Sequence, residues 1–183
     1  MNRRWFVLLA VMILVLAGSP GEIYSSPANL KGGTASIDIT PPVGGWLSGY
    51  AVRDKPSEGI ADRLFAKAVC LSDGTTEIAI VSTDLVGVTT SVVASVRRLV
   101  ENKIGIPGAN IMIAATHTHF GPVVKEYKFD KPPDPDYLVT LMEKLARVIT
   151  DAHGKLTEVR IGTATGAAGE LAYNRRSGRT EDP

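Results

Sequence analysis

The sequence predicts an α/β fold with a mixed, partly parallel β-sheet flanked by helices. Two apolar runs of strand length, Ile78–Val81 and Ile111–Ala115, are separated by a segment with helical periodicity. This strand–helix–strand order implies a crossover connection and parallel pairing of the two strands. An Asp-Gly pair between two β-rich runs indicates a hairpin, so the sheet should also contain antiparallel strands.

The remaining strands follow from alternation and from the residues that interrupt it. The first, Thr34–Thr40, places its apolar residues on one face, and a Pro-Pro pair ends it. The Lys-Gly-Gly segment before it is expected to be flexible. The hairpin comprises Leu64–Leu71 and Glu77–Asp84, and a last strand is expected at Val159–Ala164.

Two amphipathic helices are predicted, each with recognisable ends. Thr89 or Thr90 can cap the first helix, which runs to about Lys103. Its apolar stripe consists of Val92, Val93, Val96, Leu99 and Val100. The second helix runs from about Asp136 to His153, and the following Gly closes it. Its inward residues are Leu138, Leu141, Met142, Leu145, Val148 and Ile149.

A long loop rich in Gly and Pro follows the first strand and carries two large aromatic side chains. The loop spans Pro41–Glu58 and contains Trp46 and Tyr50. Such aromatics either plug a loop onto the core or line a site, and we expect the plug.

The segment after the strand Ile111–Ala115 is the main candidate site. His117 and His119 follow this strand, and a Gly-Pro pair then ends it. Side chains two residues apart point to the same face of a strand, so both imidazoles should project together from its carboxyl end. Two adjacent imidazoles indicate a metal site, with zinc the first choice. The alternative is two unrelated polar residues at a junction between strand and loop.

Three other features surround the candidate site. Asp84 ends the neighbouring strand, where it could bind the metal, orient an imidazole, or simply accept a loop amide. The loop from Val123 to Pro135 follows the histidines and could form a lip over them. His153 lies in the last turn of a helix, where a cation suits the helix dipole, so we interpret it as a surface residue and not a ligand.

The N-terminal residues 1–28 are predicted to be a signal peptide. A basic start is followed by thirteen apolar residues, Trp5–Ala17, a run too short to span a bilayer comfortably. Cleavage sites are available after Ala28 and near Ser19, so the mature protein should be secreted or periplasmic. The alternative is an uncleaved membrane anchor.

The predicted mature chain has the composition of a single neutral globular domain. Removing Arg3, Arg4 and Glu22 with the leader lowers the formal charge from +1 to 0, which gives no electrostatic basis for binding nucleic acid. The single cysteine, Cys70, cannot form an internal disulfide. It lies in an apolar strand pattern and is expected to be an inert core residue.

Several ordered segments resemble the neutral/alkaline (non-lysosomal) ceramidases. The resemblance extends over nearly all of the chain after the leader, and the order and spacing of the segments carry it. The segments are Ala35–Pro42, Leu47–Ala51, Gly59–Asp62, Ile80–Leu85, Ala115–Pro122 and Tyr173–Arg176.

The resemblance implies a zinc-dependent amidase that hydrolyses the N-acyl bond of ceramide or a related lipid to a sphingoid base and a fatty acid. It implies that His117 is a zinc ligand and that His119 is a catalytic residue near the metal-bound water and the substrate carbonyl. It also implies that Arg175 contacts the substrate. A ceramide-like lipid would be the partner, with peripheral membrane contact through that substrate.

Two departures from the family pattern stand out. Phe120 occupies the position where the motif usually continues with Ser, which adds apolar bulk beside the metal. The resemblance further implies that the other zinc ligands, a His, a Glu and a Tyr, lie beyond Pro183, together with an immunoglobulin-like domain. Residues 33–183 are therefore expected to be the N-terminal portion of a catalytic domain, an incomplete domain that lacks activity alone.

The residues argue against one alternative function and leave another open. A metallo-β-lactamase-like hydrolase also places His-x-His after a strand, but it continues with Asp and His where Gly121 and Pro122 stand. The other alternative is a non-enzymatic secreted α/β domain with a vestigial metal site.

Overall fold

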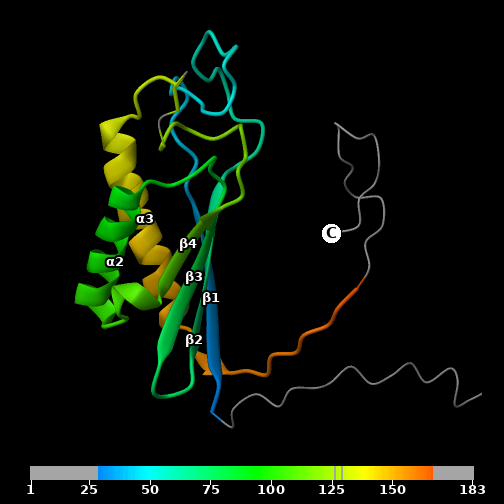
Figure 1. The fold of residues 1–183 in the computed structure, drawn as a ribbon, viewed down its shortest axis with the longest axis vertical. Helices are drawn as coiled ribbons and strands as arrows, with labels where there is room; N and C mark the ends of the chain where they lie inside the picture. Colours follow the sequence, from blue (N-terminus) through cyan, green and yellow to red (C-terminus); the bar gives the residue numbers. More distant parts are fainter. Residues whose placement is uncertain (1–28, 126, 129, 167–183) are drawn as a thin grey trace, which may run out of the picture. The chain divides into compact units, whose positions relative to one another are not determined.

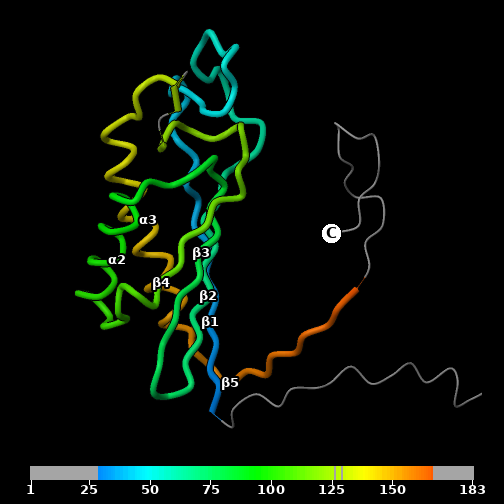
Figure 2. Tube along the Cα trace, viewed as in Figure 1, coloured from blue at the N-terminus to red at the C-terminus, as the bar shows by residue number. Residues whose placement is uncertain are grey.

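Five strands form one mixed sheet in the order β4-β3-β2-β1-β5 (Figures 1 and 2). The structure, a computed structural model, describes residues 29–166 except 126 and 129. The strands are β1 (Lys31–Asp38), β2 (Phe65–Ser72), β3 (Glu77–Thr83), β4 (Ile111–Ala115) and β5 (Thr157–Glu158). β3 and β4 are parallel, whereas the other neighbouring strands are antiparallel. The predicted mixed, partly parallel sheet is therefore confirmed.

The hairpin between β2 and β3 has the turn chemistry that its sequence indicated. The Asp73 carboxylate accepts hydrogen bonds from the backbone N–H groups of Thr75 and Thr76, at 2.8 and 2.7 Å. Gly74 adopts a φ of 89°, a conformation that favours glycine. This local geometry sets the register of β2 against β3.

β1 begins three residues earlier than predicted, because its glycines pair in the sheet. Gly33 lies directly beneath the end of helix α3 (Pro135–His153), and a Cβ atom there would lie 2.2 Å from the carbonyl oxygen of Ala152. The segment that was expected to be flexible is thus a close contact between a strand and a helix, which only glycine permits.

Both predicted helices are confirmed, with their capping residues. Helix α2 (Thr90–Ile104) is capped by the Thr89 side chain, which accepts from Val92 N, and it ends at Gly105 in the left-handed conformation. The side chain of Asp134 caps α3. A short 3-10 helix, η1 (Gly108–Asn110), leads from α2 into β4.

The two helices cover the same face of the sheet, and the core lies between them and that face (Figure 1). Fully buried members include Val81, Val96, Val100, Ile111, Leu141, Leu145 and Ile149. The opposite face carries Lys67 and Ser82 but also Ile80 and Met112, the last 53% exposed. Apolar side chains therefore remain on this face, which neither α2 nor α3 covers.

The predicted strand Val159–Ala164 is wrong. β5 pairs only with Lys31 and Gly32, the first two residues of β1, and Val159 N donates to Leu30 O at 3.0 Å. Because β5 runs antiparallel to β1, residues after Glu158 would have to pair with residues before Lys31, where β1 begins. Residues 160–166 belong to a second unit of the chain, and they contain no helix or strand.

The leader prediction lies outside the described residues, since the placement of residues 1–28 is not described. Within the described part of the chain, neither helix is both long and apolar enough to cross a bilayer.

Candidate metal centre

The segment that follows β4 stays paired with the segment that follows β3. Thr116 N donates to Thr83 O, and His117 N donates to Leu85 O, each at 2.9 Å. β4 nevertheless ends at Ala115, and His117 has a φ of 65°, the left-handed region that non-glycine residues rarely adopt. Among the described residues, no other non-glycine residue has a positive φ. Backbone outliers of this kind are concentrated at functional sites.

The two imidazoles meet, although not by the alternation of a strand. The ring centroids of His117 and His119 lie 5.0 Å apart, and their Nε2 atoms lie 3.4 Å apart. Because both residues lie beyond the end of β4, the left-handed turn at His117 replaces strand alternation as the cause. The two imidazoles lie close together as expected, but the predicted cause, the alternation of side chains along a strand, was wrong.

A backbone carbonyl fixes the tautomer of His117. Its Nδ1 lies 2.7 Å from the carbonyl oxygen of Val86, which can only accept, so Nδ1 carries the hydrogen. In the neutral imidazole, Nε2 then keeps its lone pair and faces His119. Histidines that bind metals usually donate their other N–H to a carbonyl or carboxylate in this way.

The loop that carries the aromatic residues is joined to the histidine segment by backbone hydrogen bonds. Ser48 N donates to Gly121 O at 3.0 Å, and Leu47 forms an antiparallel bridge with Pro122. This pairing places Tyr50 against His119, with ring centroids 5.0 Å apart at an interplanar angle of 75°. Tyr50 is 45% exposed, so the expected plug is wrong for this residue, which lines the site instead.

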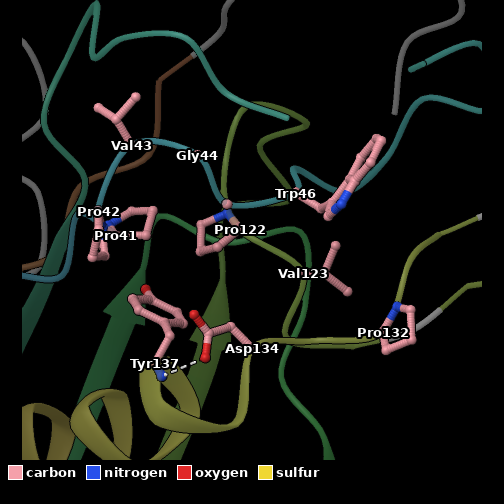
Figure 3. A pocket seen from close by; sticks show the side chains of 11 residues that line it. Pro41, Pro42, Val43, Gly44, Trp46, Pro122, Val123, Pro132, Asp134 and Tyr137 are labelled. Atoms are coloured by element: carbon pink, nitrogen blue, oxygen red, sulfur yellow. Dashed lines mark hydrogen bonds between the residues drawn. The ribbon is translucent and has the colours of Figure 1, made fainter. Parts of the chain in front are cut away.

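Trp46 is one of the residues that line a cavity beside Pro122 (Figure 3). This cavity of about 310 Å³ is lined by prolines at 41, 42, 122 and 132 and by Tyr137, with Trp46 at its edge. The Lys131 ammonium lies 5.3 Å from the Trp46 ring centroid. The Tyr137 hydroxyl donates to Ile39 O at 2.7 Å, and burial raises the pKa of this phenol.

The predicted lip, residues 123–135, is anchored to the aromatic loop. The hydroxyl of Ser48, which is fully buried, donates a short hydrogen bond to the Asp130 carboxylate. The same carboxylate oxygen accepts from Tyr127 N at 3.4 Å. Lys125 and Tyr127 also lie close to Gly87, the neighbour of the residue that orients His117. The lip is therefore held beside the histidines by defined contacts.

An apolar groove of about 410 Å³ begins at the histidine segment. Thr118 and Phe120 form one wall. The rest of its lining includes Pro41, Pro42, Val43, Leu47, Ile60 and Leu64. Phe120 is 66% exposed, and its ring lies 5.8 Å from that of Tyr50. Apolar surface thus lies next to the histidine segment, although neither His117 nor His119 lines the groove.

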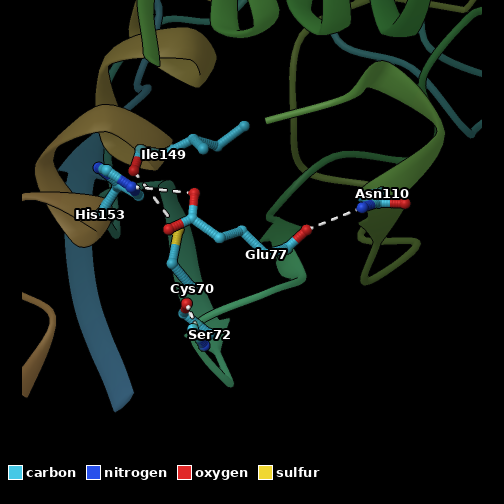
Figure 4. Close-up of polar contacts among 7 residues, drawn as sticks. Cys70, Ser72, Glu77, Asn110, Ile149 and His153 are labelled. Atoms are coloured by element: carbon cyan, nitrogen blue, oxygen red, sulfur yellow. Dashed lines mark hydrogen bonds and ion pairs between the residues drawn. The ribbon is translucent and has the colours of Figure 1, made fainter. Parts of the chain in front are cut away.

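Asp84 and His153 take other roles. The Asp84 carboxylate accepts from Phe65 N at 3.0 Å, which is the structural alternative left open by the sequence. His153 lies in the last turn of α3, as expected, and its Nε2 is 3.2 Å from a carboxylate oxygen of Glu77 (Figure 4). Its side chain is only 28% exposed, so this histidine is more enclosed than a surface residue.

Comparisons with known proteins show the family and the fold of this chain. The sequence model for the neutral/alkaline non-lysosomal ceramidase family, N-terminal part, matches residues 31–178. The chain belongs to this family. The fold is similar to the crystal structure of neutral ceramidase from Pseudomonas aeruginosa, with a TM-score of 0.59, 24% identity and 70% of this chain covered. It is also similar to a ceramidase complexed with C2, with a TM-score of 0.58, 24% identity and 70% coverage of this chain. The match spans 22% of each of those two chains.

The donor atoms of this ceramidase-family chain can be compared with the requirements of a zinc site. Two nitrogen ligands at 2.0–2.1 Å from a tetrahedral zinc lie roughly 3.4 Å apart, and the two Nε2 atoms have this separation. Within the described residues, however, no group of three or more His, Cys, Asp or Glu side chains could hold a metal. The donors fit zinc chemically, and a complete shell requires ligands from elsewhere.

Sequence reasoning identified some site residues of this ceramidase-family chain and missed others. Arg175, the expected substrate contact, lies outside the described residues. Val86 was missed, because only its backbone oxygen takes part and no sequence signal marks that. Tyr50 and Arg53 were missed as neighbours of His119, although the aromatic residue on a long loop was a signal that could have indicated them.

Proposed function

We propose that this chain supplies part of a zinc-dependent, ceramidase-type amidase site that cleaves the N-acyl bond of ceramide or a related lipid. The observation that carries the proposal is the oriented histidine pair. His117 is fixed by the carbonyl of Val86, and its Nε2 lies 3.4 Å from Nε2 of His119. Membership of the ceramidase family supports the same reaction class.

In the proposed mechanism the two histidines have different roles. His117 is the metal ligand, because its tautomer leaves the lone pair of Nε2 available to a metal ion. Zinc, when bound, acts as a Lewis acid on the amide carbonyl and activates water near neutral pH. His119 is placed to accept a proton from the attacking water at Nε2 and to deliver it to the nitrogen as the C–N bond breaks. The products are a sphingoid base and a fatty acid.

The lipid character of the substrate has structural support. The apolar groove that begins at Phe120 offers a surface for hydrocarbon next to the histidines. One structural relative is a ceramidase complexed with C2. We further propose that Arg175 contacts the polar part of the substrate and that contact with a membrane occurs through the substrate.

We also propose that the chain is exported, because the N-terminal residues 1–28 have the pattern of a signal peptide. A secreted or periplasmic enzyme can reach lipids of outer membrane surfaces without crossing a bilayer. N-terminal sequencing of exported protein should give a first residue between Gly18 and Leu30. Intact Met1 in the membrane fraction would contradict export with cleavage.

A second candidate is a non-enzymatic secreted α/β domain with a vestigial metal site. It is favoured by one observation, that the described residues offer two imidazoles and no third ligand beside them. In that case the chain would bind zinc weakly and would hydrolyse no amide.

The test is zinc stoichiometry measured together with hydrolysis of a fluorescent N-acyl sphingosine. Both are measured for the 183-residue chain and for the longest product of its gene. Weak zinc binding by the chain, with tight binding and hydrolysis by the longer product, is the expected result. Absence of hydrolysis from every product would favour the non-enzymatic candidate.

A further inference from the structure

Three residues of one loop, Gly49, Tyr50 and Arg53, contact His119. We call these residues the His119 cradle. Each touches His119 in a different way, through close backbone approach, through a ring and through a hydrogen bond. The proposed function assigns a role to His119 but none to the cradle.

Gly49 allows the imidazole to approach the loop backbone. A Cβ atom at this position would lie 2.5 Å from Cγ of His119 and 2.8 Å from its Cβ. Gly49 also has a φ of 104°, a conformation that side chains disfavour. Any other residue here would move either the loop or the His119 ring.

Tyr50 contacts the His119 ring in an edge-to-face arrangement, with centroids 5.0 Å apart at 75°. This geometry is favourable for aromatic pairs and restricts rotation of the imidazole about χ2. Arg53 N donates to Tyr50 O at 3.2 Å, which closes a turn and places both side chains on the histidine. The ring thus has a defined position relative to Arg53.

Arg53 connects the turn to the main chain of His119. Its Nη2 donates to His119 O at 3.0 Å, and its guanidinium carbon lies 5.6 Å from the Tyr50 ring centroid. Its Nε is buried and has no hydrogen-bond partner in the described part of the chain. A buried N–H without a partner is unfavourable, whereas the hydrogen bond to His119 O is favourable.

We propose that Arg53 is a positioning residue for His119, acting with Tyr50 to hold Nε2 of His119 toward His117. The inference rests on the proposed function for the catalytic role of His119, but the geometric claim concerns this chain alone. Arg53 acts through the carbonyl and the ring, and it need not touch the substrate. Lysine could replace the hydrogen bond but not the planar contact with Tyr50.

The first test is NMR spectroscopy of the 183-residue chain without metal. In Arg53→Met, which keeps the apolar stem, the nuclear Overhauser contacts between the Tyr50 and His119 rings should be lost. The Nδ1 resonance of His117 should not move, because Val86 still holds that ring. Arg53→Lys should restore part of the contacts. Arg98→Met, at an exposed arginine on α2, is the matched control and should change nothing.

The second test uses zinc content and kinetics in the longest product of the gene. Arg53→Met should keep its zinc and lose about a hundredfold in kcat, since misplacement of a catalytic group by about 1 Å costs that much. KM should change little. If Arg53→Met fails to fold by circular dichroism, Arg53→Gln, which is polar but too short to keep the same contacts, takes its place with the same expected changes.

Intact ring contacts and unchanged kcat in Arg53→Met would overturn the positioning role. An Arg53→Lys variant as impaired as Arg53→Met in both measurements would overturn the part of the proposal that assigns positioning to the hydrogen bond, and would leave the contact with Tyr50 as its cause. If the parent protein hydrolyses no amide, the proposed function fails, and the NMR comparison still decides whether Arg53 holds His119.

Discussion

Two clusters of polar residues lie at opposite ends of β3, and both contain histidine. At the start of β3, His153 pairs with the Glu77 carboxylate, while Asn110 donates to Glu77 O and Cys70 Sγ donates to Ile149 O (Figure 4). Beyond the end of β3, His117 has a left-handed backbone, a carbonyl partner at Nδ1 and an Nε2 that faces the His119 imidazole. Satisfied partners and ordinary backbone indicate a structural role, whereas backbone strain beside a pair of facing imidazoles indicates a functional one.

Cys70 shows how closed the first cluster is. The side chain is 1% exposed, and burial, with a smaller contribution from the Glu77 charge, raises the pKa of its thiol to about 11. A thiol that stays protonated is a poor nucleophile, which agrees with the expectation of an inert core residue. The thiol is therefore unavailable to a ligand without local unfolding, although the His153 and Glu77 side chains are partly exposed.

Replacing one histidine from each cluster should give the largest difference in zinc binding and activity between the two clusters. His117→Ala should lose zinc binding and amide hydrolysis, because it removes the only oriented ligand of the described residues. His153→Ala should retain both. Zinc stoichiometry and N-acyl sphingosine hydrolysis are measured in the longest product of the gene, with circular dichroism to verify folding. Full metal content and activity in His117→Ala would show that the central residue is wrongly assigned.

His119→Ala separates the two members of the pair. It should keep most of the zinc but reduce kcat by about 10²- to 10⁴-fold, the usual contribution of a general acid–base group. The readouts are zinc content and kcat, with His153→Ala again as control. A large loss of zinc in His119→Ala would instead make this residue a second ligand, as the 3.4 Å separation of the Nε2 atoms would allow.

A core substitution should affect stability without selective effect on the site. Leu145 on α3 is fully buried, so Leu145→Ala should lower the free energy of unfolding by about 2–5 kcal/mol. Val139→Ala, at a 52% exposed position on the same helix, should change it by less than about 0.5 kcal/mol. Urea denaturation measures both. An equal effect of the two substitutions would contradict the packing of α3 on the sheet.

The smallest expected effect concerns Asp38, a stabilising carboxylate at the site end of the sheet. Hydrogen bonds from the Thr40 side chain and backbone, together with Arg63, lower its pKa from 3.8 to about 2. A depressed pKa adds stability that is present above pH 4 and is lost as the pH falls toward 2. Asp38→Asn should therefore make the free energy of unfolding less dependent on pH between 4 and 2. An unchanged slope would argue against these contacts.

Local signals predicted the fold well where they agreed with tertiary packing. The Thr89 cap and the Asp-Gly turn each contain their own hydrogen-bonding partners, so the sequence around them suffices. The strand expected at Val159–Ala164 is absent because a strand needs a neighbour. β5 runs antiparallel to β1, so the chain after Glu158 passes the first residue of β1, Lys31. Gly33 was misjudged for a related reason, since its role depends on a helix end more than a hundred residues away in the chain.

The site was only partly visible in the sequence. The His-x-His pattern indicated the two imidazoles, but the carbonyl that orients His117 belongs to Val86, whose side chain is irrelevant to the contact. The contact between Tyr50 and His119 joins two loops that are far apart in the sequence. It depends on the backbone hydrogen bond between Ser48 and Gly121. Such contacts have no periodicity, so no local pattern predicts them.

The left-handed backbone of His117 also makes this position locally frustrated, because the residue that suits the chemistry does not suit the main chain. An L-residue in this conformation costs roughly 1–2 kcal/mol, and glycine avoids that cost. His117→Gly should thus be more stable than His117→Ala by about 1 kcal/mol, although both lack the imidazole. A homologue that had lost its activity would be free to carry glycine or asparagine here, so the residue at position 117 would distinguish a working site from a relic.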